Sequence, residues 1–247
     1  MNTFIRLPAK LLLGAFALMA FSEISYAQDH PAAAPLVVVE LFQSQGCSSC
    51  PPAEANLNAI AGQPNILALS FAVTYWDNLG WKDTFASEAF TNRQYDYSHY
   101  RKQDGVYTPQ VMVNGQKELV GTNRTQLDQV IADAHTQGPS LSWAKGQLVV
   151  GAGKPAAPTD VWLVRYDPRV ISVAIRAGEN GGRTLPHRNV VRELVNLGTW
   201  DGGAKTFNVP VSTLPGLSTA ALVQIKGGGD ILGASKESGV ARDPTSR

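Results

Sequence analysis

The sequence has 247 residues, and its 21 basic residues nearly balance 20 acidic ones, so the formal net charge is +1. This near balance gives no basic surface for nucleic acid or for an anionic membrane. Only two cysteines are present. Disulfides therefore cannot form the scaffold, and hydrophobic cores have to hold the chain together.

The first 27 residues have the pattern of a secretory signal peptide. Arg6 and Lys10 precede an apolar run from Leu11 to Phe21, and Ser25-Tyr26-Ala27 suits cleavage after its last residue. The apolar run is short for a spanning helix, and no later stretch is long and uncharged. We therefore expect a leader at 1–27 and a periplasmic or secreted mature protein that is not inserted in a membrane. An uncleaved anchor is the alternative.

After a flexible lead-in at 28–35, the chain predicts a β-α-β unit. Leu36 to Leu41 is an apolar run broken only by Glu40, the pattern of a strand buried on both faces. Apolar residues then recur at helical spacing until Gly62, and Ile66 to Thr74 forms a second buried strand. Such a unit implies two parallel strands with a right-handed crossover.

The next segment, 75–107, is aromatic and polar and contains one expected helix. Two strands at Gln110–Val113 and Lys117–Val120 follow, and then a helix at Thr125–His135. This order of elements is that of a thioredoxin-like sheet. The sequence therefore predicts an α/β thioredoxin-like domain at 36–139, with a mixed central sheet flanked by helices and the helical segment 75–107 inserted.

Beyond residue 139 the pattern changes to short alternating strands separated by clusters of Gly, Pro, Asp and Asn, without helical spacing. We expect an all-β, sandwich-like domain at 140–247. Two domains also suit the length of the chain that remains after leader removal. The expected strands are Leu148–Val150, Val161–Tyr166, Ile171–Ile175, Val190–Leu197, Phe207–Val211 and Ala220–Ile225.

The two cysteines, Cys47 and Cys50, form a C-x-x-C motif at the predicted strand-to-helix junction. A ring this short does little for folding but suits a two-electron switch. At a first helical turn, unpaired N–H groups and the helix dipole favour the thiolate. Cys47 precedes the helix, so it should face solvent and attack a partner's disulfide. Cys50, followed by Pro51, should be shielded and resolve the mixed disulfide.

Two further positions are candidate parts of this site. Glu40 is the one charge in the first buried strand, and it could relay a proton to or from Cys50, unless it faces the surface at the strand end. Thr108-Pro109 directly precedes a strand, where a cis bond would turn a carbonyl toward an extended peptide. Pro109 would then orient the peptide.

Aromatic residues gather after the second strand. Tyr75, Trp76 and Trp81 could wall a groove beside Cys47 and bind a peptide together with Thr108. The alternative is that they cover the core under a long loop, because large aromatic side chains dominate core burial.

Three runs of this sequence resemble a known family. They are Glu40–Ala53, Tyr75–Asp83 and Gly105–Gln110, and the likeness continues through Gly178–Asn180 and Asn189–Arg192. Together they resemble the secreted bacterial family catalogued as domain of unknown function 1223. The resemblance implies a thioredoxin-like domain with a C-x-x-C pair and a carboxyl-terminal extension. It implies no settled substrate.

The sequence thus predicts an exported thiol-disulfide oxidoreductase whose only redox group is the Cys47–Cys50 pair. Its partners would be exported proteins with thiols or disulfides, or a membrane electron donor, positioned by the β domain. The first alternative is a copper-binding or copper-delivery protein in which Cys47, Cys50 and His99 hold Cu(I). No second C-x-x-C and no Met cluster completes that ligand set. The second alternative is a non-catalytic binding module with vestigial cysteines.

Overall fold

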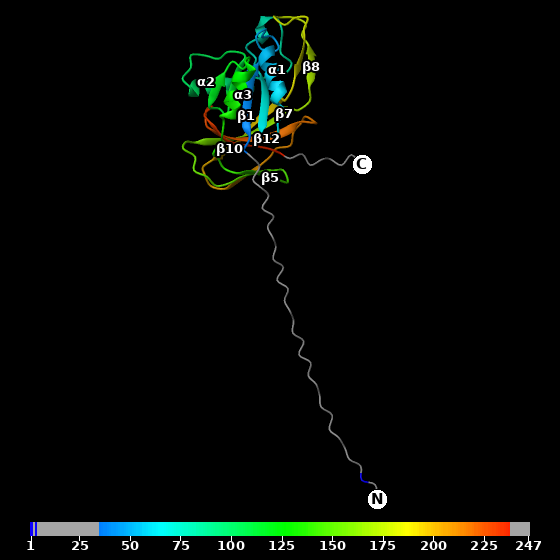
Figure 1. Ribbon diagram of the computed structural model, residues 1–247, viewed down its shortest axis with the longest axis vertical. Helices are drawn as coiled ribbons and strands as arrows, with labels where there is room; N and C mark the ends of the chain where they lie inside the picture. Colours follow the sequence, from blue (N-terminus) through cyan, green and yellow to red (C-terminus); the bar gives the residue numbers. More distant parts are fainter. Residues whose placement is uncertain (2, 4–34, 238–247) are drawn as a thin grey trace. The chain divides into compact units, whose positions relative to one another are not determined.

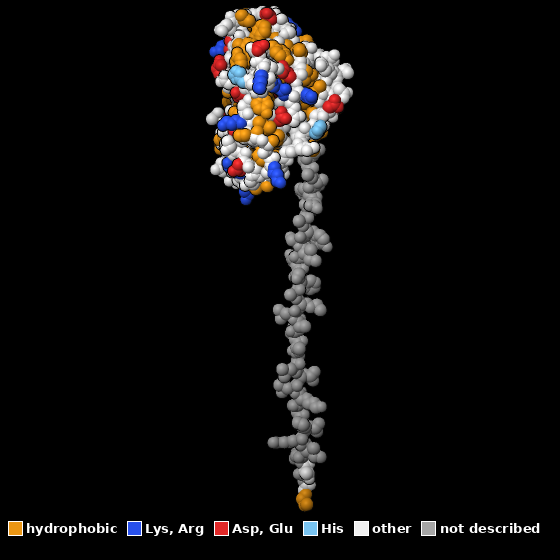
Figure 2. All heavy atoms as spheres, turned by 90° about the vertical axis from the view of Figure 1, so that its left-hand side faces the viewer, with side chains coloured by type: hydrophobic (Ala, Val, Ile, Leu, Met, Phe, Trp, Pro, Cys, Tyr) orange, Lys and Arg blue, Asp and Glu red, His pale blue; other side chains and the backbone are white. Residues whose placement is uncertain are grey.

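The computed structural model describes residues 1, 3 and 35–237. The predicted leader, apart from residues 1 and 3, and the lead-in up to residue 34 lie outside the described residues. No helix in the described part of the chain is long and apolar enough to cross a membrane. On the face seen in Figure 2, basic and acidic side chains are interspersed, as the balance of charges in the sequence suggests.

Within residues 35–237, eight strands form one mixed sheet in the order β13-β12-β7-β10-β2-β1-β3-β4. Figure 1 labels β1, β7, β10 and β12 of this sheet. β1 and β2 are parallel, and β3 runs antiparallel to β1. In the sheet order, the strands are β13 (Ile231–Lys236), β12 (Ser218–Ile225), β7 (Thr159–Asp167), β10 (Val190–Trp200), β2 (Ile66–Ala72), β1 (Val37–Gln43), β3 (Gln110–Val113) and β4 (Lys117–Leu119).

Helices cover both faces of the sheet around β1. The helices are α1 (Pro51–Ile60), α2 (Glu88–Tyr100), α3 (Arg124–Ala132) and the short 3-10 helix η1 (Asp77–Leu79). Val39 and Leu41 of β1 share a core with α1 and α3, whereas Val38 and Phe42 share one with α2. Because successive strand residues point to opposite faces, β1 is buried at all seven positions. The residues of β1 form a nearly continuous apolar run because the strand is buried on both faces of the sheet.

The region after residue 139 supplies strands of the large sheet and two small sheets. Among the described residues these are a three-stranded sheet in the order β11-β6-β5 and the ribbon β8-β9. Leu148 and Phe207 of the three-stranded sheet pack with Val161 of β7 and Val223 of β12, so two β layers face each other here. The strands are β5 (Leu141–Ala144), β6 (Gln147–Val150), β8 (Ile171–Ala174), β9 (Thr184–His187) and β11 (Lys205–Asn208).

The boundary predicted between residues 139 and 140 does not divide the large sheet. β10 joins β2 in parallel at Val190 and Ser70, and the Ser70 N–H donates to the Asn189 carbonyl at 3.0 Å. The Asn189 side chain donates to the Ala68 carbonyl at 2.8 Å. A buried strand has to pair both of its edges, and the later region provides the partner that β2 lacks within 36–139. The described residues from 35 onward accordingly belong to one compact unit.

Candidate functional site

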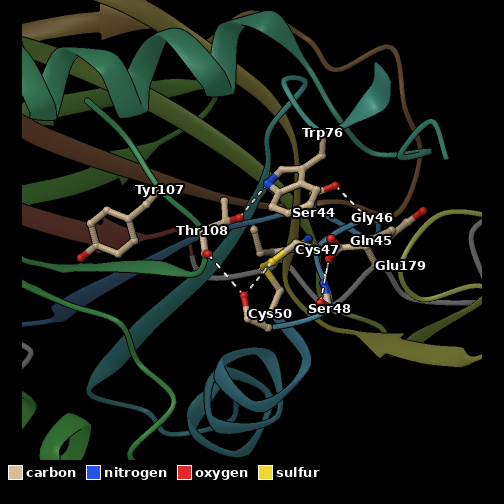
Figure 3. Close-up of a disulfide and its surroundings, with 12 residues drawn as sticks. Ser44, Gln45, Gly46, Cys47, Ser48, Cys50, Trp76, Tyr107, Thr108 and Glu179 are labelled. Carbon is tan, nitrogen blue, oxygen red and sulfur yellow. Dashed lines mark hydrogen bonds between the residues drawn. A yellow bond between two sulfur atoms is a disulfide. The ribbon is translucent and has the colours of Figure 1, made fainter. Parts of the chain in front are cut away.

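Cys47 and Cys50 form a disulfide at the beginning of α1 (Figure 3). Beyond the end of β1 the chain turns tightly, with the Cys47 N–H donating to the Ser44 carbonyl at 3.1 Å and the Cys50 N–H donating to the Cys47 carbonyl at 3.2 Å. Cys50 caps the helix, and Pro51 starts it at a position whose N–H would have no helical partner. The disulfide therefore lies where the backbone N–H groups of α1 point outward.

The prediction that Cys47 faces solvent is wrong. Its exposed fraction is 0%, and that of Cys50 is 1%. Ser48 and Ser49, between them, are exposed. The sequence places Cys47 correctly before the helix, but the loop that binds the backbone around it comes from a distant part of the chain.

The loop that binds the backbone around Cys47 joins β8 to β9. The Asn180 side chain donates to the carbonyls of Gln45 and Cys47, at 2.9 Å each. The Glu179 carboxylate accepts from the N–H of Ser48 at 3.0 Å and from its hydroxyl at 2.7 Å. These bonds from Ser48 hold the pKa of the Glu179 carboxyl below its usual range. The backbone on both sides of Cys47 is thus bound by one distant loop. Figure 3 shows the contact of Glu179 with Ser48.

Thr108-Pro109 lies beside the disulfide. The peptide bond between them is cis, which confirms that expectation. The Thr108 carbonyl lies 3.5 Å from the Ser49 hydroxyl, which in turn lies 3.3 Å from the Cys47 sulfur. Trp76 donates its indole N–H to the Thr108 hydroxyl at 2.8 Å (Figure 3). Thr108 and Trp76 are therefore parts of the immediate surroundings of the C-x-x-C motif.

The three predicted aromatic residues divide between the site and the core. Trp81 donates to the Gln45 side chain at 2.9 Å, so it holds the loop before Cys47. Tyr75 and Trp76 both pack against the core on the α2 face of the sheet. The Tyr75 hydroxyl donates to Gln94 at 3.2 Å, and burial raises the pKa of Tyr75 to about 12. All three are half-buried, and Trp76 and Trp81 donate hydrogen bonds to residues beside the motif.

Glu40 is buried, but the structure does not bring it to Cys50. Its carboxylate accepts from Arg93 Nε at 2.8 Å, from Arg93 Nη2 at 3.2 Å and from the Tyr97 hydroxyl. Burial lowers the pKa of Arg93, but the charge of Glu40 outweighs it and raises that pKa above its usual range. These partners belong to α2, whereas Cys50 begins α1 on the opposite face of the sheet. The predicted proton relay lacks its geometry because a buried carboxylate binds the nearest cation.

His99 also lies away from the cysteines. It occupies the end of α2, exposed and stacked on Tyr95 with ring centroids 6.2 Å apart. The next residue but one, Arg101, donates to the Gly115 carbonyl, in the turn near the beginning of β1. The cysteines follow the opposite end of that strand. Cys47, Cys50 and His99 therefore do not meet as one ligand set, and the described residues contain no group of three His, Cys, Asp or Glu side chains arranged around a metal.

Three buried ionisable residues near the motif escaped the sequence analysis. Asp83 accepts from the Gln45 N–H at 2.7 Å. Glu54 lies one helical turn beyond Cys50 and bonds His187 Nδ1 at 2.6 Å. Burial lowers the pKa of His187, but the hydrogen bond and charge of Glu54, with the charge of Asp83, raise it overall. The signal for Glu54 was a carboxylate at helical spacing from Cys50. His187 comes from β9 and had no local signal.

Asp83 should make stability depend on pH. Burial raises its pKa from 3.8 to about 6, so its contribution to folding is fully present below 3.8 and is lost as pH rises through about 6. Between these values stability should fall by up to about 1.4 kcal/mol per pH unit from this group. Urea denaturation of the wild type and of Asp83→Asn at pH 4.5 to 6.5 tests this: the variant should have a flatter pH dependence, because its side chain does not ionise, and its stability relative to the wild type should rise with pH. Parallel profiles would contradict the assignment.

Together the fold and the site define a mixed-sheet protein whose disulfide begins a helix and whose C-x-x-C backbone is bound by a loop from the later strands. The sequence profile of the family described as "Protein of unknown function (DUF1223)" matches residues 38–224. The chain belongs to this family.

Two solved structures are similar to this chain. The chain is similar to a protein of Agrobacterium tumefaciens known from an X-ray crystal structure, with 30% identity over 82% of this chain and 94% of that one and a TM-score of 0.69. HBP35 of Porphyromonas gingivalis shares the fold, with 12% identity over 87% of this chain and 78% of that one and a TM-score of 0.56. No match was found among curated proteins.

Proposed function

We propose that this protein is an exported thiol-disulfide oxidoreductase that exchanges disulfides with protein partners through Cys47 and Cys50. One observation carries the proposal: the disulfide begins α1, and the backbone of Thr108 lies beside it. A thiolate at this position gains from the unpaired N–H groups and the dipole of the helix. A three-residue separation gives a ring too short to contribute much to folding.

The exchange follows from the order of the two sulfurs. In the oxidising direction a partner's thiolate attacks Cys47, their sulfurs bond, and Cys50 leaves as a thiolate that takes up a proton. The partner's second thiolate then attacks the partner's first sulfur, which is bonded to Cys47 in the mixed disulfide. The partner's two sulfurs bond, and Cys47 leaves as a thiolate. The partner has lost two electrons and the Cys47–Cys50 pair has gained them. In the reducing direction Cys47 attacks and Cys50 resolves.

Several features support the wider proposal. Parallel β1 and β2, antiparallel β3 and β4, and helices on both faces are the arrangement expected of a thioredoxin-like fold. Thr108 and Pro109 would orient an extended segment of the partner. The leader pattern at 1–27 supports a periplasmic or secreted location. Partners would then be exported proteins with thiols or disulfides, or a membrane electron donor.

A trapping experiment tests the function. The reduced Cys50→Ser variant keeps the attacking thiol and lacks the resolving one, so it should accumulate a stable mixed disulfide with oxidised glutathione, seen by mass spectrometry. The Cys47→Ser variant is the matched control and should accumulate at least about ten times less. Equal trapping by both variants would contradict the assigned roles. Wild type that shows no two-electron transition across a series of glutathione buffers would overturn the function itself.

A further inference from the structure

The ribbon β8-β9 carries the loop that is hydrogen-bonded to the backbone around Cys47. Within the described residues its two strands pair with each other and not with the large sheet. The loop between them therefore has fewer constraints than a connection between central strands. Gly178 and Gly182 have φ values of +72° and +83°, which glycine adopts at little energetic expense. They flank Glu179 and Asn180, the two residues that contact the C-x-x-C motif.

The loop contacts the motif through one buried side chain and one exposed side chain. Asn180 is 0% exposed. Both of its side-chain atoms are used: the nitrogen donates to the carbonyls of Gln45 and Cys47, and the oxygen accepts from Arg183 at 2.7 Å. Glu179, by contrast, is exposed and holds the outer edge of the loop to Ser48. One contact is therefore buried and the other can be reached from solvent.

With the loop in this position, the disulfide cannot exchange with a protein partner. A partner's sulfur has to touch the Cys47 sulfur, and no surface of Cys47 is exposed. Gly178 also packs closely on Trp81, since a Cβ built on Gly178 would lie 3.1 Å from Trp81 Cβ. The loop thus rests on the segment that follows η1 as well as on the motif.

We propose that residues 178–182 form a lid over the disulfide, latched by Asn180 and Glu179, which has to lift before a protein partner can reach Cys47. This inference rests on the proposed thiol-disulfide exchange and adds the step that controls access to it. Glu179 and Asn180 are positioning residues, because they act through the motif's backbone and not on the sulfurs. Lifting exchanges four hydrogen bonds for bonds to water or to the partner.

Two substitutions should weaken the hydrogen bonds that hold the lid while keeping the size of the side chains nearly unchanged. Asn180→Asp keeps the oxygen that accepts from Arg183 but turns a carboxylate toward the two carbonyls. Glu179→Gln keeps the length of the side chain and removes its charge. Asn208→Asp is the matched control, because Asn208 is an exposed acceptor of a bond from Gln147 on the three-stranded sheet.

The measurement is the rate at which the oxidised protein is reduced by reduced thioredoxin and, separately, by a small phosphine. Asn180→Asp should raise the rate with thioredoxin roughly 10-fold or more, because two hydrogen bonds of ordinary strength hold the lid there. Glu179→Gln should raise it by a smaller factor, and Asn208→Asp should leave it unchanged. The phosphine rate should rise less in each case, since a smaller reagent needs a smaller opening.

Thermal unfolding measurements check that each variant is folded. If Asn180→Asp does not fold, the reduction rate of Glu179→Gln tests the lid on its own. Wild-type rates in both latch variants would overturn the lid and leave the exchange function standing. Equal acceleration with both reductants would also overturn it, because that is the behaviour of general destabilisation. A disulfide that neither reductant reduces in any folded variant would contradict the proposed function as well.

Discussion

Replacing Arg93 with methionine is expected to lower the free energy of unfolding by about 3–5 kcal/mol. The substitution leaves Glu40, which is 0% exposed, as a buried carboxylate without its cation. The Tyr97 hydroxyl remains as a donor but carries no charge. Arg93 also stacks between aromatic rings, with its guanidinium carbon 5.7 Å from the ring centroid of Phe71 and 5.8 Å from that of Trp162. Methionine fills this space only in part.

Urea denaturation measures this effect, and two further variants interpret it. Arg124→Met removes an exposed i,i+4 pair with Asp128, so it should lower stability by less than about 0.5 kcal/mol. Adding Glu40→Gln to Arg93→Met removes the unpaired charge and should recover a large part of the loss. A loss below about 1 kcal/mol in Arg93→Met would show that Glu40 does not need its cation.

Substituting Gly228 by alanine should destabilise the protein by about 2–5 kcal/mol. Gly228 has φ of +85°, a conformation that strains an L-residue by about 1–2 kcal/mol. A Cβ there would lie 2.4 Å from the backbone carbon of Asp96 in α2. Backbone cannot move aside as a flexible side chain can, so overpacking adds about 1–3 kcal/mol. The turn between β12 and β13 would be pushed away from α2.

The neighbouring glycine is a matched control. Gly227 has φ of +75°, but a Cβ there would meet nothing within 4 Å. Gly227→Ala should therefore cost only about 1 kcal/mol, from backbone strain alone. Chemical denaturation of both variants separates strain from overpacking. Equal losses would mean that the turn does not pack on α2 as closely as the structure has it.

Local patterns accounted for much of the fold around the site. The apolar run of β1, the helix after the cysteines and the strand that follows Pro109 all appear where the sequence indicates them. Strands β6, β7, β8, β10 and β12 lie where the sequence predicts strands, and β11 overlaps its predicted range only at Phe207 and Asn208, whereas β5, β9 and β13 were not predicted. β9 contains Pro186, which argues against a strand in sequence but is tolerated in a two-stranded ribbon.

The errors concern contacts between residues far apart in the chain. Asn180 binds the carbonyl of Cys47 across a separation of 133 residues, and Arg93 binds Glu40 across 53. Neither the spacing nor the composition of the sequence indicates Asn180 or Arg93 as a partner of these residues. β10 similarly completes the edge of β2 through a single parallel pair. Sequence alone therefore placed Cys47 in solvent and left Glu40 either as a proton relay to Cys50 or at the surface, and neither alternative for Glu40 holds.

The sequence by itself determined that two cysteines stand at the start of a helix behind a doubly buried strand, because hydrophobic periodicity and helix starts are properties of neighbouring residues. Only the tertiary structure decided which distant groups lie around these residues. The β8–β9 loop binds the backbone carbonyl of Cys47, and Glu40 pairs with Arg93 instead of approaching Cys50. Those choices follow from which distant groups can satisfy a buried donor, acceptor or charge once the chain has folded.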